Sequence, residues 1–240
     1  MKKTYLLWLT FLMLFATLLA ACGGATQGVA DEISNPTEPP APTQAAADAG
    51  PAQDQAGDSP LGELVFKIVP QESEARFGID EVLAGSPNHV VGTTSDVQGE
   101  IRVDAGNPAG ASVGTITIGA DSLATDNNFR NRAIANFILQ SGDYPTVTFT
   151  PTKITGLPES VGVGDRLNFQ ISGDLKLRDI TQPVTFDVTV DVESGTRISG
   201  TAQATIQRAD FDLQIPSVPQ VASVSERVLL ELYFVAESGS

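Results

Sequence analysis

The 240-residue sequence contains a single histidine, His89, and a single cysteine, Cys22. Serine or cysteine catalysis usually needs a histidine base beside the nucleophile, and most zinc sites need several His or Cys ligands. One residue of each type cannot build a Ser-His-Asp triad or a His-x-x-x-His site. A disulfide within the chain is excluded, because Cys22 has no second cysteine to pair with. We therefore expect no enzyme, no metal site and no cofactor.

Carboxylates are the remaining groups that could carry chemistry. Asp210 and Asp212 would share one face of a strand, although neighbouring Arg208 makes an ordinary ion pair the better interpretation. Three further aspartates could offer oxygen ligands to calcium, but their spacing matches no recognised loop: Asp121, Asp126 and Asp143.

Basic residues are scarce. The chain has 14 Lys and Arg against 29 Asp and Glu, a net charge of −15. A nucleic-acid partner is therefore not expected, because such partners require a basic surface. The same charge opposes contact between the folded part and an anionic lipid surface, and it keeps the chain soluble.

The N-terminus has the order of an export signal. Lys2 and Lys3 precede an apolar run of about 15 residues, which is short against the roughly 20 that a spanning helix requires. The run ends in Leu19-Ala20-Ala21-Cys22, which resembles a bacterial lipobox, where the cysteine receives a diacylglyceryl group. The sequence predicts a lipoprotein signal peptide over residues 1–21 and an extracytoplasmic protein anchored to a membrane through lipid on Cys22.

Composition divides the rest of the chain into two parts. Residues 22–60 are rich in Ala, Pro, Gln, Gly and Asp and contain no aromatic or basic residue, so we expect a disordered linker there. Residues 61–240 are long enough for one domain with a core of its own.

Apolar residues in the second part mostly recur at every second position, which is typical of strands with one buried face. Val184–Val192 is the clearest case, with Thr and Asp between the apolar residues. Leu167–Ile171 alternates too, and Gly173-Asp174 separates it from Leu175–Leu177, which predicts two consecutive strands. Asp126–Gln140 instead has apolar residues at helical spacing after a capping residue. These patterns predict a mainly antiparallel β structure with one helix, arranged as a closed barrel or a sandwich.

The run Gly173–Val184, GDLKLRDITQPV, resembles the central motif of the YceI-like polyisoprenoid-binding domain family. Asp179 and Asp212 stand where that family often has glycine. Other parts of the resemblance follow in the same order over about Leu64–Ala236: Ser73 with Phe77, Gly92–Gly99, Phe129-Arg130-Asn131, Tyr144-Pro145 and Gln207–Phe211.

This resemblance implies a lipocalin-like antiparallel barrel of eight strands, whose apolar cavity binds a polyisoprenoid amphiphile such as a quinone or a prenyl phosphate. Arg130 is the first candidate for contact with the head group, ahead of Arg132, Arg178 and Arg208; surface ion pairs are the alternative for all four. The expected function is a non-enzymatic lipid carrier or store. The second hypothesis is a surface protein-interaction barrel with a filled core and no ligand. If a cavity exists, the following residues are expected to line it: Ile116, Ile118, Val147, Phe149, Leu167, Phe169, Ile171, Phe186, Val188, Leu230, Leu232 and Phe234.

Overall fold

A computed structural model of the protein describes residues 63–104 and 106–239. The expected signal peptide, Cys22 and the linker up to residue 60 lie outside the described residues. In the described part no helix has the length and apolar character needed to cross a membrane.

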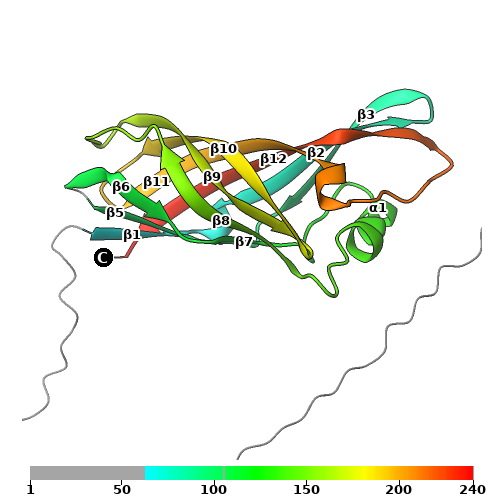
Figure 1. The fold of residues 1–240 in the computed structure, drawn as a ribbon, viewed down its shortest axis with the longest axis horizontal. Coiled ribbons are helices and arrows are strands. Elements are labelled where there is room, and N and C mark those ends of the chain that lie inside the picture. The colour runs from blue at the N-terminus through cyan, green and yellow to red at the C-terminus, as the bar shows by residue number, and fades with distance from the viewer. Residues whose placement is uncertain (1–62, 105, 240) are drawn as a thin grey trace, which may run out of the picture. The chain divides into compact units, whose positions relative to one another are not determined.

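One antiparallel sheet of twelve strands makes up most of the described residues and curls around an interior (Figure 1). This confirms the mainly antiparallel β prediction. The sheet has more strands than the eight expected, and several of them are short, such as β4 with two residues and β7 with four. The strands are β1 Glu63–Ile68, β2 Glu74–Leu83, β3 Ser86–Thr94, β4 Val97–Gln98, β5 Glu100–Asp104, β6 Asn107–Val113, β7 Ile116–Gly119, β8 Thr146–Thr155, β9 Arg166–Leu177, β10 Ile180–Val192, β11 Arg197–Gln207 and β12 Val221–Ser238.

The order in the sheet is β4-β7-β8-β9-β10-β11-β12, and β12 then pairs with two neighbours. Its longer N-terminal part pairs with β2, and its C-terminal end pairs with β1. The two edges approach each other where Thr93, at the end of β3, exchanges backbone hydrogen bonds of 2.8 and 3.0 Å with Ala124. The ladder therefore continues around the interior instead of leaving a long open edge there.

The β9 segment differs from the sequence prediction. It is one strand of 12 residues that runs through Gly173-Asp174, not two strands separated there. The reason is a close approach: a Cβ on Gly173 would lie 2.5 Å from the backbone oxygen of Thr150 and 2.7 Å from the ring of Phe149. Glycine lets the Phe149 ring lie across the neighbouring strand, so it serves packing and not a turn.

The predicted helix exists, with a different geometry. An α-helix, α1 (Asn128–Ala133), continues into a π-helical turn, η2 (Ile134–Ile138). The cap is Asn127, whose side chain accepts hydrogen bonds from the backbone N–H groups of Phe129 and Arg130. Ile134 is buried, whereas Phe129 and Phe137, which the spacing places on one apolar face with Ala133, are 78% and 62% exposed. Phe129 and Phe137 therefore share an exposed face of the helix, while Ile134 and the partly buried Ile138 lie on its covered side.

Three short turns complete the fold. They are 3-10 helices η1 (Pro70–Glu72) and η3 (Arg208–Phe211), and the two-residue hairpin between β9 and β10. Arg178 in that hairpin and Asp212 after η3 both have positive φ, of 55° and 47°. Aspartate tolerates this conformation better than most residues, which fits its place where related sequences often have glycine.

The end of the sheet near the C-terminus is held by a surface cluster of charges around Arg197. Its guanidinium contacts Glu72 and Glu193 at 2.6 and 2.9 Å, and it also pairs with Glu237. These hydrogen bonds lower the pKa of the Glu72 carboxyl, and those from Ser199 and then Arg197 lower the pKa of the Glu193 carboxyl. The charges at this end are thus satisfied by one another.

Replacing Gly173 tests the close approach of β8 and β9. Gly173→Ala is expected to lower the free energy of unfolding by about 1–3 kcal/mol, because the new methyl group must push against a backbone carbonyl and an aromatic ring. Chemical denaturation of the domain measures this directly. Gly142→Ala is the control, since a Cβ there meets nothing within 4 Å. Equal effects of the two changes would contradict the packing role of Gly173.

Candidate functional site

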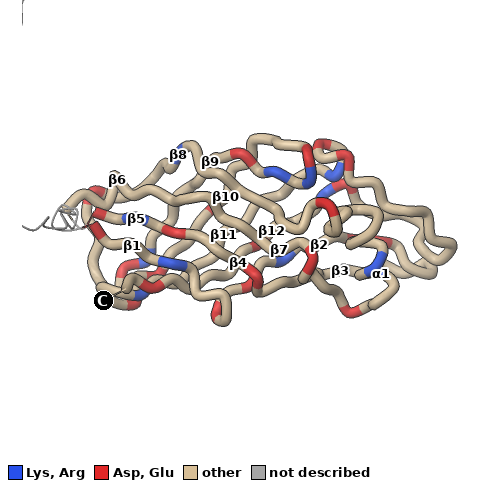
Figure 2. The backbone as a smooth tube through the Cα atoms, turned by 90° about the horizontal axis from the view of Figure 1, so that it is seen from below, with Lys and Arg blue, Asp and Glu red and all other residues tan. Residues whose placement is uncertain are grey.

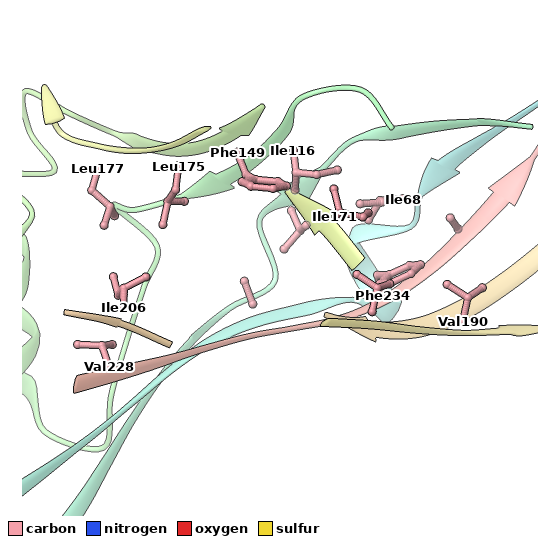
Figure 3. Packing of buried hydrophobic residues seen from close by; sticks show 14 of the residues in the cluster. Ile68, Ile116, Phe149, Ile171, Leu175, Leu177, Val190, Ile206, Val228 and Phe234 are labelled. Carbon is pink, nitrogen blue, oxygen red and sulfur yellow. The ribbon is translucent and has the colours of Figure 1, made fainter. Parts of the chain in front are cut away.

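A cavity of about 1000 Å³ occupies the interior of the curled sheet. Alternation along the strands produces it, because every second side chain points inward and nearly all of these are apolar. In Figure 3, residues of β7, β8 and β9 such as Ile116, Phe149 and Leu175 face Ile206, Val228 and Phe234 of β11 and β12 across the interior. The site is thus a wall of hydrocarbon built from strands distant in sequence.

The structure brings together all twelve residues expected to line a cavity. Each of them contributes to its wall. The rings of Phe149 and Phe186 meet edge to face, with centroids 4.9 Å apart. The wall includes the following: Ile116, Ile118, Val147, Phe149, Leu167, Phe169, Ile171, Phe186, Val188, Leu230, Leu232 and Phe234.

These side chains do not fill the interior. Leu167, Phe169 and Phe186 point inward and yet are only partly buried. Side chains that packed on one another in a close-packed core would lose this exposure. Together with the cavity volume, this does not favour the hypothesis of a filled barrel.

Sequence reasoning missed part of the wall. Phe77 and Ile79 of β2 and Val90 of β3 also line the cavity. Phe77 could have been found from its place in an alternating run near the first strands. Gly92, which lies directly opposite Phe77 in the sheet, was the second indication. A Cβ on Gly92 would lie 2.1 Å from the Phe77 ring, so glycine makes room for the ring against the wall.

The cavity reaches the surface at both ends of the barrel, since exposed residues belong to its wall at each end. We call the end formed by Glu81, Asn127, Phe129, Arg130 and Val218 the helical mouth. The opposite end, which we call the far mouth, is formed by Pro108, Ala111, Leu157, Val161 and Val163. In Figure 1 the helical mouth lies at the end with α1, and the far mouth at the end with β5, β6 and the C-terminus.

Two charged side chains of the cavity wall, Glu81 and Arg130, meet at the helical mouth. Glu81 occupies an inward-facing position of β2, and its carboxylate accepts from Arg130 Nη2 at 3.1 Å and from Asn88 Nδ2 at 2.9 Å. The Arg130 and Glu81 side chains are only 21% and 9% exposed, whereas Asp126, which also pairs with Arg130 at 2.6 Å, is 87% exposed. A half-buried ion pair thus stands at the rim of an apolar cavity.

The other candidate head-group residues have different surroundings. Arg178 donates to the backbone oxygens of Ile138, Phe211 and Asp212 at 3.3, 3.2 and 2.9 Å, which ties η2 and η3 to the β9–β10 hairpin. Arg208 lines the cavity, but its guanidinium donates to the carbonyl oxygens of Ser225 and Leu213 and to the Glu226 carboxylate. Arg132 is exposed. The backbone amides of Phe129 and Arg130 at the start of α1 are capped by the Asn127 side chain.

The candidate catalytic and metal groups do not converge. Asp210 and Asp212 lie in and after η3 and not on a strand, and Arg208 pairs with Glu226 instead of with them. His89 bonds to Asp80 at 2.7 Å on the outer surface. Within residues 63–104 and 106–239 no group of three or more His, Cys, Asp or Glu is arranged to hold a metal ion.

The model of the YceI-like domain matches residues 66–236. The chain belongs to the YceI-like domain family. This confirms the resemblance found in the Gly173–Val184 run. No curated protein matches the chain significantly.

Solved structures show the YceI-like fold in distant proteins. A polyisoprenoid binding domain from Saccharophagus degradans, implicated in plant cell wall breakdown, is 17% identical with a TM-score of 0.59, over 73% of this chain and 99% of that one. BcnA of Burkholderia cenocepacia is 19% identical with a TM-score of 0.55, over 70% of this chain and 98% of that one. Both solved chains consist almost wholly of this fold, so the YceI-like domain folds without a further domain.

Proposed function

We propose that the protein is an extracytoplasmic, non-enzymatic lipoprotein that holds a polyisoprenoid or similar long-chain amphiphile in the cavity of its YceI-like domain. The observation that carries the proposal is the unfilled apolar interior of about 1000 Å³. This volume is at the upper end of the range for small-molecule sites. The polyisoprenoid binding domain of similar fold supports the choice of ligand class.

Affinity comes from the tail of the ligand. Each methylene that leaves water contributes roughly 0.8 kcal/mol, so a chain of several prenyl units is held by hydrocarbon contact alone. An apolar wall without fixed polar groups deep inside does not discriminate finely between tails of similar width. The cavity therefore selects for a long, slim hydrocarbon tail. Both a quinone and a prenyl phosphate have such a tail.

The head group is assigned to the helical mouth. Glu81 and Arg130 stand there, whereas the far mouth is lined by apolar and small residues such as Leu157, Val161 and Pro108. Arg130 holds the exposed carboxylate of Asp126, and an exposed pair of this kind contributes little. A phosphate or carbonyl oxygen of the ligand can take the place of Asp126 while the buried contact with Glu81 persists.

Extraction of lipid from the purified domain tests the proposal. Residues 61–240 are purified without detergent and extracted with organic solvent, and a prenyl lipid is expected in the extract by mass spectrometry. Ile171→Trp is expected to weaken uptake of a fluorescent prenyl probe about tenfold, because the indole displaces some two methylenes of the tail. Lys176→Trp, on the outer face of the same strand, is the control. Absence of both bound lipid and probe uptake would refute the carrier function.

Paired ligands test the position of the head group. Arg130→Gln combined with Glu81→Gln, which leaves no buried charge unpaired, is expected to weaken binding of a prenyl phosphate about tenfold through loss of a charge-assisted hydrogen bond. Binding of the corresponding prenyl alcohol is expected to change little. Titration of both ligands by fluorescence measures the difference, with Arg227→Gln on the outer surface as control. Equal losses for both ligands would place the head group elsewhere.

The lipid anchor is tested at the N-terminus. In a bacterial host the mature chain is expected to begin at Cys22 and to carry a diacylglyceryl group, as measured by mass spectrometry of its N-terminal peptide. Cys22→Ala is expected to abolish this modification, because no other thiol is present, whereas Gly23→Ala retains it. An unmodified Cys22 in the mature protein would contradict the anchor.

A further inference from the structure

Exposed aromatic rings gather at the helical mouth. Among the described residues the most exposed large hydrophobic side chains are Phe129 at 78%, Val163 at 67% and Phe137 at 62%, and Val218 is 46% exposed. Phe129 and Phe137 come from α1 and η2, and Val218 from the loop before β12. Two phenyl rings exposed to water near each other indicate a surface that binds a partner or a membrane.

The helix that carries these rings is firmly attached by its other side. Ile134 is buried, and Asn131 bonds to the hydroxyl of Thr125 at 2.6 Å. Arg130 pairs with Glu81, and Arg178 donates to the carbonyl of Ile138. The rings are therefore held outward by a fixed support, since the same helix presents other residues to the core.

A cation accompanies the rings. The guanidinium of Arg132 lies 4.6 Å from the centre of the Phe129 ring. Arg132 is exposed and has no acidic partner within the described part of the chain. Figure 2 shows a basic position on α1 in a domain where acidic residues outnumber basic ones. Aromatic rings with a neighbouring cation are the side chains that favour the boundary between lipid head groups and acyl chains.

This surface continues into the cavity. Phe129 and Val218 belong both to the helical mouth and to the cavity wall, and Ala133 of α1 lines the cavity beside them. A long prenyl tail that left a bilayer at another place would cross water, at a cost of roughly 0.8 kcal/mol for each methylene exposed. Passage along Phe129 avoids this exposure.

We propose that Phe129, Arg132, Phe137 and Val218 form a membrane-docking rim, which inserts into a phospholipid surface and brings the helical mouth into contact with the bilayer. The rim rests on the proposed lipid-carrying function and adds the route by which the ligand enters. Docking is shallow and reversible, since only a few apolar side chains enter the lipid. The acidic remainder of the domain limits docking to this one end.

The experiment uses residues 61–240 without the N-terminal segment, so that no covalent lipid contributes. Flotation with vesicles of phosphatidylcholine, with and without one-fifth phosphatidylglycerol, measures docking. Phe137→Ser is expected to weaken vesicle binding about tenfold, from the loss of one buried ring. Arg132→Gln is expected to weaken binding to the anionic vesicles only. Val163→Ser, an equally exposed apolar position at the far mouth, is the control and is expected to bind as the wild type does.

Transfer kinetics separate the rim from the cavity. Phe137 and Arg132 do not line the cavity, so their variants are expected to bind a prenyl probe from solution with unchanged affinity. Uptake of the same probe from vesicles is expected to be about tenfold slower in Phe137→Ser. The rim proposal is wrong if the wild-type protein does not bind vesicles. It is also wrong if Phe137→Ser takes up the probe from vesicles at the wild-type rate. Vesicle binding lost only in Val163→Ser would overturn it as well, in favour of the far mouth.

Discussion

The inward alternation of apolar side chains on a curled sheet is the constraint on which the rest of the structure depends. Each long strand turns one row of side chains toward the concave side of the sheet. The apolar side chains there do not fill the space that the curled sheet encloses. An unfilled interior sacrifices dispersion contacts and stability. The ladders compensate around the whole wall, as in β9 and β10, which pair from Leu177 and Ile180 to Arg166 and Asp191.

Glycine and aromatic residues set the thickness of that wall. Phe149 lies over Gly173, and Phe77 over Gly92, so large rings lie flat against neighbouring strands instead of filling the middle. A Cβ at either glycine would force its ring toward the cavity. The space left for a ligand thus depends on residues that never contact it.

Charge is distributed by the same logic. Arg197 and its carboxylate partners stabilise one end, while Arg178 and Arg208 use their donors to fix the turns at the other. The cavity wall is mostly apolar, and Arg130 with Glu81 places an ion pair at the helical mouth. The described domain thus presents an acidic outer surface to water and a mostly apolar wall to its cavity.

The sequence by itself determined the fold class, most strands and the inward faces, because a period of two fixes which side chains share a face whatever the strands pair with. It could not determine that Gly173 lies within a strand, since the reason is a ring on another strand. It placed Phe129 and Phe137 on one apolar face of the helix but could not determine that this face is exposed, because exposure depends on which side of the helix packs against the rest of the fold, here the side of buried Ile134. Only the tertiary structure decided that the interior stays open, because the cavity volume depends on the curvature of the whole sheet and on the positions of all the side chains that line it.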